Sequence, residues 1–512
     1  MKLSLCFISI TILLILSFNT FAQCDKRVPA FPGAEGFGAY VTGGRGGKVI
    51  IVSNLNPDGV GSFQEALNQN EPRIIVFNVS GVIKKDPIIV PYGDLTIAGQ
   101  TSPGGITING RFYSKWEAIV DNVIVRNLRI RPEYTGQVAG NQFDGIQFSA
   151  NKGIIFDHIS VSGAVDEVVD IYHGNDVTFQ YSTVEFSGSQ GHDEGAHNYG
   201  LISKDARVSI HHNIFAHHQN RNPCMSVGPA ESINNVAYNV RHGFVHHNDA
   251  TGEFNLVGNY FIDGSNDRLI PFYFDDEDQS SHSSYYLNDN YYVGHDNCNG
   301  VINNPWTECD DNLVLDESHR SETIFDFSDD GEYYEPITIQ SSSAAYDLVM
   351  QKAGAFPRDI LTRTALQDIR DKTGEWGAFI PDDYMEGIEI NNAPIDSDRD
   401  GMPDVWENQN NLDPNNYSDN ILDYNCDGYT NIEEYINSFF SEELTCSNQG
   451  GICCDNSCNG VIKYANDCTC CIGTCNTCSI SKNDVYNKIS EWKTGDVNQL
   501  NLINYIRDWK DC

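Results

Sequence analysis

The chain has 512 residues, which is enough for one large hydrophobic core with smaller units attached. Its formal net charge is −39, so its overall field does not attract nucleic acid or anionic membranes. If its ligand is also acidic, local arginines or bound cations must overcome the repulsion. The charge alone would equally suit an exported protein adapted for solubility.

Residues 1–22 have the pattern of a secretory signal peptide. Lys2 precedes an apolar run, and Thr20 and Ala22 place small residues at the −3 and −1 positions of a cleavage site. The run is short for a membrane span and no second run follows it. We therefore expect a secreted, extracellular protein, in a compartment that permits disulfides.

A short apolar pattern recurs between about residues 100 and 265, as VRNLRI, FDHISV, FQYSTV, IHHNIF, INNVAY and LVGNYF. The segments begin at Val125, Phe156, Phe179, Ile210, Ile233 and Leu256, which are 31, 23, 31, 23 and 23 residues apart. A near-constant step between β-rich segments is typical of a solenoid, whose stacked coils align like residues into interior ladders. The strands of an antiparallel β-sandwich, the alternative, repeat at shorter spacing. The sequence therefore predicts an all-β, right-handed parallel β-helix, with residues 23–390 forming this domain and about 330–390 wrapping along it.

The stretch HHNIFAHHQNRNPC, residues 211–224, carries four histidines and could be a metal site. In register with the other coils, His211, His212 and Asn213 fall where those coils carry polar residues such as Asp157 and His158. We therefore expect them to form hydrogen-bonded rungs along the stack rather than to converge on a metal.

One column of polar side chains is predicted on successive coils. A polar residue recurs 12 or 13 positions before the ladder residue, and the series is Asp144, Asp166, His197 and Arg221. Asp170 lies four residues after Asp166, on the same strand face. Coils stack about 4.8 Å apart, so the carboxylates would repel one another unless a cation lay between them, and oxygen ligands suit Ca²⁺. The bland alternative is solvated surface aspartates, but the arginine in register favours a site.

Four segments resemble one known family: AFPGAEGFGAYVTGGRGGKVIIVSNLNPDGVGSFQEAL, FDGIQF, IIFDHISVSGAVDEVVDI and HHNIFAHHQNRNP. Over about residues 29–265 the chain is similar to the pectate lyases of polysaccharide lyase family 1, in particular to secreted bacterial members. The resemblance implies a parallel β-helix that cleaves 4-linked α-galacturonan by calcium-assisted β-elimination. The products would be unsaturated oligogalacturonates, and the partner an acidic polysaccharide such as pectate.

The resemblance also implies residue roles. Asp144, Asp166 and Asp170 match the family's calcium-binding acids. Arg221, in the tripeptide RNP, matches the arginine thought to remove the proton at carbon 5 of a galacturonate unit. Such a proton is weakly acidic, and Ca²⁺ on the neighbouring carboxylate stabilises the charge that develops when the proton leaves.

Two positions depart from the family pattern. Ser226 stands where many members carry a second arginine, and His197 stands where a substrate-contacting lysine is common. Recognition of the substrate carboxylates would then use His197, Lys204 or Arg241. These departures leave open a non-catalytic β-helix that binds acidic polysaccharide. Pectin lyase action, or galacturonan hydrolysis by paired acids on the same fold, are further alternatives.

Residues 391–440 carry two twelve-residue patterns, DSDRDGMPDVWE and DYNCDGYTNIEE, each with oxygen donors at positions 1, 3, 5 and 12 and a glycine at position 6. The donors are Asp396, Asp398, Asp400 and Glu407 in the first loop, and Asp423, Asn425, Asp427 and Glu434 in the second. This spacing is typical of EF-hand-like calcium loops, and the pair resembles dockerin-like and thrombospondin-type-3-like modules. We expect a structural Ca²⁺ in each loop, against the alternative of a solvated acidic linker.

Residues 441–512 form a cysteine-rich tail. Ten of the 16 cysteines lie at or after Cys446, which predicts a disulfide-stapled knot of undetermined pairing more than a zinc site. Apolar residues after position 484 follow a helical period and predict two short amphipathic helices. These helices could bind the cell surface or a protein partner, or could simply pack on the knot.

Overall fold

The computed structural model describes residues 26–440 apart from 205, 247–249, 275–281, 295–298, 309–316 and 329–333, and beyond these the strand residues 452–453, 458–463 and 470–475. The predicted signal peptide and the predicted helical pair of the tail lie outside the described residues. Within these described ranges, no helix combines the length and the apolar character needed to cross a membrane.

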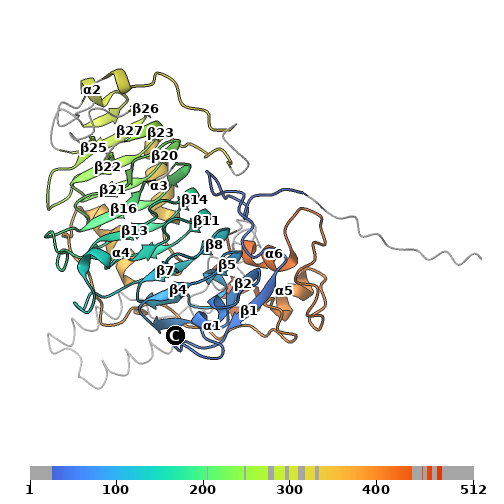
Figure 1. The fold of residues 1–512 in the computed structure, drawn as a ribbon. Coiled ribbons are helices and arrows are strands. Elements are labelled where there is room, and N and C mark those ends of the chain that lie inside the picture. The colour runs from blue at the N-terminus through green and yellow to red at the C-terminus, as the bar shows by residue number, and fades with distance from the viewer. Residues whose placement is uncertain are drawn as a thin grey trace, which may run out of the picture.

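Most of the described strands belong to three sheets (Figure 1). The first sheet contains β1 (Lys48–Val52), β2 (Arg73–Phe77), β5 (Leu95–Ala98), β8 (Val123–Arg126), β11 (Lys152–Asp157), β14 (Asn175–Gln180), β17 (Val208–His211), β20 (Ala230–Ile233), β23 (Thr251–Val257) and β26 (His282–Asn288). The second contains β4 (Ile88–Val90), β7 (Phe112–Ser114), β10 (Ile146–Gln147), β13 (Glu167–Asp170), β16 (Tyr199–Ser203), β19 (Cys224–Met225), β22 (His242–His246) and β25 (Ile270–Phe274). The third contains β3 (Gly81–Lys84), β6 (Ile106–Asn109), β9 (Leu128–Ile130), β12 (Ser160–Val161), β15 (Thr183–Glu185), β18 (Ile214–Ala216), β21 (Val236–Tyr238), β24 (Tyr260–Ile262), β27 (Asn290–Val293) and β28 (Gly300–Ile302).

The chain visits these sheets in strict rotation. From β2 to β27 it passes from the first sheet to the third, then to the second, and back to the first. Neighbouring strands pair in parallel, and only β28 runs antiparallel to its neighbour β27 within these three sheets. The predicted right-handed parallel β-helix is therefore confirmed, and a β-sandwich is excluded.

The interior ladder follows the predicted spacing with one correction. Phe156 pairs with Val125 and Phe179, and Phe179 pairs with Ile210, as expected. The next member is Ser232 rather than Ile233, because Ile210 pairs with Ser232. A one-residue shift moves a side chain to the other face of a strand, so Ile233 packs outside the ladder with Val257 and Ile337. The interior serine is tolerated because its hydroxyl accepts a hydrogen bond from Asn235 Nδ2, at 3.2 Å.

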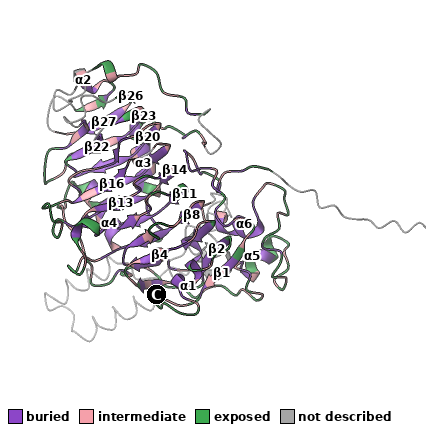
Figure 2. Ribbon diagram, viewed as in Figure 1, coloured by how far each residue is buried: buried purple, intermediate pink, exposed green. Residues whose placement is uncertain are grey.

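The histidine-rich stretch forms rungs, as the register predicts. His211 pairs in the first sheet with Gln180, and all four histidines of the stretch are fully buried. The strands of the coils are mostly buried as well (Figure 2). The backbone amide of Asn213 donates to Asn235 Oδ1 at 3.0 Å, and Asn235 repeats this contact to Asn259 at 3.0 Å. Among the described residues, none of the four histidines joins a group of three metal-ligating side chains.

Two helices cover the third sheet. These are α3 (Ser342–Lys352) and α4 (Ile360–Asp371), and their buried apolar residues pack against side chains of β18, β21 and β24. Each begins at a capping side chain, since Ser341 accepts from the Ala344 amide and Asp359 accepts from the Thr362 amide. Within the segment that the sequence predicts to wrap along the solenoid, these two helices pack on the third sheet, and α4 does so through an amphipathic face.

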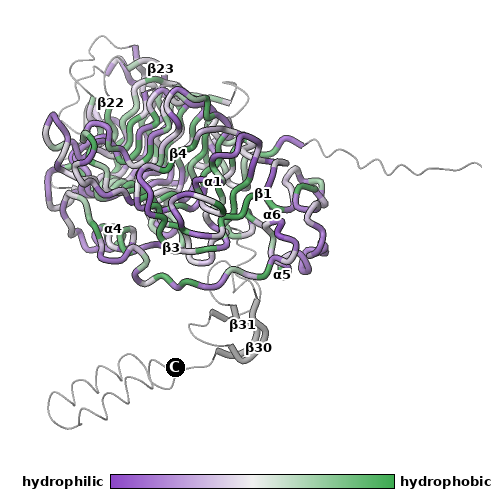
Figure 3. The backbone as a smooth tube through the Cα atoms, turned by 60° about the horizontal axis from the view of Figure 1, so that its bottom comes forward, coloured by the Kyte–Doolittle hydropathy of each residue, from purple (hydrophilic) through white to green (hydrophobic). Residues whose placement is uncertain are grey.

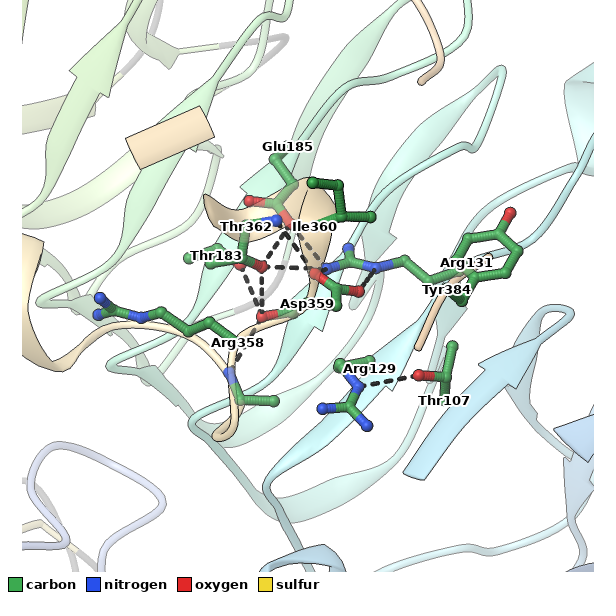
Figure 4. A network of polar contacts seen from close by, with 12 residues as sticks. Thr107, Arg129, Arg131, Thr183, Glu185, Arg358, Asp359, Ile360, Thr362 and Tyr384 are labelled. Atoms are coloured by element: carbon green, nitrogen blue, oxygen red, sulfur yellow. Dashed lines mark hydrogen bonds and ion pairs between the residues drawn. The ribbon is translucent and has the colours of Figure 1, made fainter. Parts of the chain in front are cut away.

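A buried polar network fastens α4 to the third sheet (Figure 4). Arg131, which follows β9, is fully buried and pairs with Glu185 at 2.8 Å and with Asp359 at 2.9 Å. Thr362 joins it, donating from Oγ1 to Glu185 Oε1 at 2.8 Å. Because a buried charge is stable only when paired, this network ties the helix to one position on the coils.

The acidic segment at residues 391–440 packs on the first coils instead of standing apart as a module. It contains α5 (Asp404–Gln409) and α6 (Asn431–Ser438), drawn in orange beside the blue strands β1 and β2 (Figure 1). Apolar side chains of both helices form one buried cluster with the outer face of β1, β2 and β5. Arg45 adds a buried ion pair to Glu433 at 2.9 Å.

The remaining elements are short. Helix α1 (Phe63–Leu67) packs on the interior of the first coils, α2 is Pro305–Glu308, and three 3₁₀ turns span Gly99–Thr101, Gly140–Gln142 and Glu317–His319. In the tail, β29 (Ile452–Cys453) and β30 (Cys458–Lys463) pair antiparallel with β31 (Cys470–Cys475). Cys426, in the second acidic loop, is disulfide-bonded. Apart from these strand residues, the cysteine-rich tail lies outside the described residues, and its predicted disulfide knot stays a prediction.

Candidate functional site

The predicted acidic column lies on the second sheet. Asp144 lies two residues before β10, Asp166 directly precedes β13, and Asp170 ends β13. Gln147 pairs in register with Asp170, and its Nε2 donates to both Asp144 Oδ2, at 2.9 Å, and Asp170 Oδ2, at 3.2 Å. The structure thus brings the three predicted aspartates together on neighbouring coils.

A fourth carboxylate, Glu167, was missed by sequence reasoning. Carboxylate oxygens of Asp144, Asp166 and Glu167 lie within 4.8 Å of one another, and the Glu167 amide donates to Asp144 Oδ1 at 3.2 Å. The signal was present in the spacing. Glu167 lies 12 residues before the ladder residue Phe179, the same distance as Asp144 before its own, whereas Asp166 lies 13 before it.

These carboxyls are crowded and poorly solvated. Burial, followed by the negative charges of Asp170 and Asp166, raises the pKa of Asp144 well above its ordinary value. Burial raises the pKa of Asp170 to about 6, and it also raises the pKa of Asp166. A protein reaches such an arrangement when a cation offsets the repulsion, and a donor set made only of carboxylate oxygens fits a hard cation such as Ca²⁺.

Arg221 reaches this cluster from the coil of β19, two strands along the second sheet from β13. Its guanidinium forms an ion pair with Glu167 and lies 4.4 Å from the centre of the Tyr199 ring. Its backbone is left-handed, with φ of 63°, a conformation that is strained for a residue with a side chain. Asn222, whose Nδ2 donates to the His242 carbonyl at 2.9 Å, anchors the turn that holds it.

Two histidines lie next to Asp166. The His197 ring lies 3.4 Å from that of His192, centre to centre, and His192 Nε2 is 3.6 Å from Asp166 Oδ1. Burial, and then the neighbouring His192, lowers the pKa of His197. His197 therefore stands beside Asp166, as predicted, and His192 is a further neighbour that the register did not indicate.

The other predicted substrate contacts are placed differently. Lys204 Nζ lies 5.3 Å from the centre of the Tyr172 ring. The backbone amide of Tyr172 donates to Asp170 Oδ1 at 2.7 Å, so Lys204 is close to the acidic column. Arg241 is half-exposed and pairs with Asp267 at 3.5 Å instead. Ser226, at the position of the family's second arginine, is buried.

The two acidic loops share one backbone design. Gly401 N donates to Asp396 Oδ2 at 3.1 Å, and Gly428 N donates to Asp423 Oδ2 at 3.0 Å. Both glycines have a left-handed φ, of 99° and 107°, which favours glycine over other residues at these turns. In the second loop, Glu434 returns to contact Asn425, whose Nδ2 donates to Glu434 Oε1 at 2.8 Å.

The first loop has one carboxylate beside it that the twelve-residue pattern does not include. Single oxygens of Asp396, Asp398 and Asp400 lie within 4.8 Å of one another, and so do those of Asp400, Glu407 and Asp419. Asp419 lies outside the twelve-residue pattern and was not predicted. Burial together with neighbouring carboxylates raises the pKa of Asp400 to about 8 and that of Glu407 to about 7.

No model of a known protein family matches the chain. Individual proteins do. The probable pectate lyase C of Aspergillus flavus is 34% identical over 433 residues, covering 83% of this chain and 97% of its own. The probable pectate lyase C of Neosartorya fischeri is 33% identical over 441 residues, with the same coverage of both chains. These relatives are fungal, so the bacterial type of the resemblance is not confirmed. The solved thermostable pectate lyase PL 47 aligns with a TM-score of 0.45 at 17% identity, over 63% of this chain and 97% of its own.

Proposed function

Because this chain belongs to the pectate lyase family, we propose that it cleaves 4-linked α-galacturonan by β-elimination, with Arg221 as the base and Ca²⁺ as the cofactor. The observation that carries the proposal is the contact between Arg221 and the acidic column. One guanidinium pairs with Glu167, whose carboxylate lies within 4.8 Å of those of Asp144 and Asp166, so the cation meets acids from two earlier coils of the second sheet. Asp144, Asp166 and Asp170 are proposed to hold the ion, with Glu167 beside them.

Elimination needs a proton to leave carbon 5 while the bond from carbon 4 to the glycosidic oxygen breaks. Arg221 would receive that proton, either as a neutral guanidine or by passing one of its own protons to water as it accepts the new one. Its ion pair with Glu167 and its contact with Tyr199 orient it. The electron pair of the broken C–H bond forms the new double bond between carbons 4 and 5. The leaving oxygen departs with the electrons of the C–O bond and takes a proton from water. When bound, Ca²⁺ would neutralise the substrate carboxylate and ease loss of the neighbouring proton.

Cationic and aromatic side chains around the column are proposed to bind the other galacturonate units. Lys204 and His197 stand on the coil between Asp170 and Arg221, where the polymer would cross. Arg241 is proposed as a more distant contact. We also propose that the protein is secreted, and that each acidic loop at residues 391–440 holds a structural Ca²⁺.

The test is ultraviolet absorbance of polygalacturonate incubated with the full mature chain, where an unsaturated uronate product gives a rising signal. We expect the signal with Ca²⁺ and its loss with excess chelator. Arg221→Lys should lower kcat by at least about a hundredfold, because the shorter lysine side chain cannot bring a nitrogen to the same proton. Arg320→Lys, a surface arginine paired with Glu322 at 3.3 Å, is the control and should leave turnover unchanged.

Four outcomes would count against the proposal. Full turnover by Arg221→Lys would remove Arg221 as the base. Unchanged calcium dependence in Asp166→Ala or Asp170→Ala would remove the column as the ion site. Binding of polygalacturonate and of other uronans without any absorbance change would favour a non-catalytic binding protein, and product of ordinary reducing ends without unsaturation would favour hydrolysis.

A further inference from the structure

The space between α5 and the second acidic loop holds carboxylate oxygens that lack any hydrogen-bond partner. The side chains of Asp400, Glu407 and Asp419 are almost completely buried, with exposures of 0%, 0% and 1%. Asp400 Oδ2, both oxygens of Glu407 and Asp419 Oδ1 are buried there and unpartnered, as is Asp398 Oδ2. Buried polar atoms are normally satisfied, so five unpartnered oxygens facing one another indicate a ligand that donates no proton but accepts lone pairs.

In an EF-hand-like loop the ninth residue often contributes a ligand, but in the first loop this residue is not grouped with the other acids. Asp404 occupies that position in sequence, but both of its oxygens are engaged by Ser397. Ser397 N donates to Asp404 Oδ1 at 2.7 Å, and Ser397 Oγ donates to Asp404 Oδ2 at 2.7 Å. Asp419, fifteen residues farther along, reaches the cluster in its place.

We propose that Asp419 completes a buried Ca²⁺ site with the acids of the first loop, and that this site clamps the C-terminal acidic segment onto the first coils of the β-helix. The ligands are the carboxylates of Asp396, Asp398, Asp400, Glu407 and Asp419, a set of oxygens that suits a hard divalent cation. The inference rests on the proposed function only in taking Ca²⁺ as the ion. It does not depend on the lyase reaction.

Asp419 and its neighbour Asn420 join three separate pieces of chain. Asn420 Nδ2 donates to the Asp400 carbonyl at 3.0 Å, and the Asn420 carbonyl accepts from the Ile432 amide at 3.0 Å. The Asp419 carbonyl accepts from Asn431 Nδ2 at 2.8 Å. An ion held by Asp419 and the first loop therefore fixes the start of α6 relative to α5.

The first acidic loop, α5 and α6 together pack against the first sheet. A Cβ atom at Gly401 would come within 2.7 Å of Val49 Cγ1, so the loop backbone lies directly against β1. Met402, Trp406 and Ile432 then pack with apolar residues of β1, β2 and β5 in one buried cluster. The loops around this cluster are hydrophilic (Figure 3). Without the ion, the repulsion between the carboxylates of the first loop and Asp419 opposes the packing.

The experiment compares the full-length mature chain with Asp419→Asn and with Asp404→Asn. Calcium binding is measured by calorimetry, and amide exchange by mass spectrometry over β1, β2 and β5. Asp419→Asn should weaken one calcium site at least about tenfold, because a charged ligand is lost. Asp404→Asn should leave calcium affinity within about twofold, because its oxygens already serve Ser397. In the unchanged chain, chelation should speed exchange in β1, β2 and β5 at least about tenfold, and in β20 and β23 much less.

Equal calcium affinity in Asp419→Asn and the unchanged chain would overturn the ligand assignment, as would a loss confined to Asp404→Asn. If chelation left exchange in β1, β2 and β5 unaltered, the clamp itself would be wrong. This last measurement needs no variant, so it decides the question even if Asp419→Asn fails to fold. Asp170→Ala separates the two proposals. It should abolish lyase activity while calcium still protects β1, and the loss of both together would contradict the clamp.

Discussion

At the scale of single residues, Glu167 connects the two parts of the candidate site. It is the register partner of Asp144 on the next coil, it contributes an oxygen to the acidic column, and it also holds Arg221. One carboxylate thus links the group that would remove a proton to the acids that would hold the cation. Both the ion pair with Arg221 and the binding of a cation require the Glu167 carboxylate to be ionised.

Glu167→Gln should weaken calcium binding at the column about tenfold, since one negative charge next to the ion is lost while the shape is kept. The half-maximal Ca²⁺ concentration for lyase activity and direct titration of calcium binding would both report the change. Glu194→Gln is the matched control, because Glu194 is a nearby acid that is 80% exposed. An identical calcium requirement in Glu167→Gln and Glu194→Gln would argue against any role for Glu167.

The predicted aspartates were found because a solenoid repeats, and a repeat converts position in sequence into position in space. Glu167 was overlooked because Asp166, directly before it, satisfied the same count to within one residue. Asp419 could not be found from spacing at all. Its place among the first loop's acids depends on how the segment docks on the first coils, which no local pattern records.

At the scale of elements, α4 shows how a helix is held on a solenoid. The buried network of Arg131, Glu185 and Asp359 anchors the start of this helix to the third sheet (Figure 4). The sequence predicted that this region wraps along the coils but not that it is helical. The capping residue Asp359, followed by apolar residues at helical spacing, was the available signal.

Arg131→Met should reduce the free energy of unfolding by about 3–5 kcal/mol, because it leaves Glu185 and Asp359 buried without their partner. Lys48→Met removes the exposed pair with Glu71, at 3.3 Å, and should change it by less than about 1 kcal/mol. Denaturation followed by circular dichroism, with calcium present throughout, compares the two. Equal losses would mean that the network stabilises no more than a surface ion pair does.

The same scale explains the one error in the interior ladder. A fixed step of 23 residues places Ile233 in line, but the turn between β19 and β20 is shorter by one residue, and Ser232 takes the interior position. Apolar character alone could not choose between them, because Ile233 is also buried, on the outside of the coil. Turn lengths are set by loops, and loops vary more than the strands they join.

At the scale of the whole molecule, acids and histidines give opposite pH dependences. In the two acidic loops, burial raises the pKa of Asp400 to about 8, and that of Glu407 and Glu434 to about 7. The folded, calcium-free protein then binds more protons than the unfolded chain in this range, so its stability falls as pH rises toward 8. Bound calcium removes this penalty, because it holds the carboxylates in their charged form.

Burial lowers the pKa of His212 and His217 to about 4 and that of His218 to about 3. The unfolded chain takes up these protons first, so stability falls as pH drops below about 6.5. Melting temperatures of the calcium-free protein should therefore peak between about pH 6 and 7. With saturating calcium the decline toward pH 8 should vanish and the acid decline should remain. A calcium-free protein that melts higher at pH 8 than at pH 6.5 would contradict this balance.

The antiparallel strand β28 affects whether copies of the protein can associate end to end. A stack of parallel coils ends in open strand edges, and such an edge is a template on which another molecule could continue the stack. Here the third sheet ends in an antiparallel strand, β28, so a parallel coil cannot be added in register. The first sheet ends under residues 317–321, where Ser321 N bonds the Tyr285 carbonyl of β26 at 2.8 Å. At the end of the stack formed by β25, β26 and β28, the addition of a further coil is therefore opposed at two of the three sheets, which hinders growth end on end into fibres.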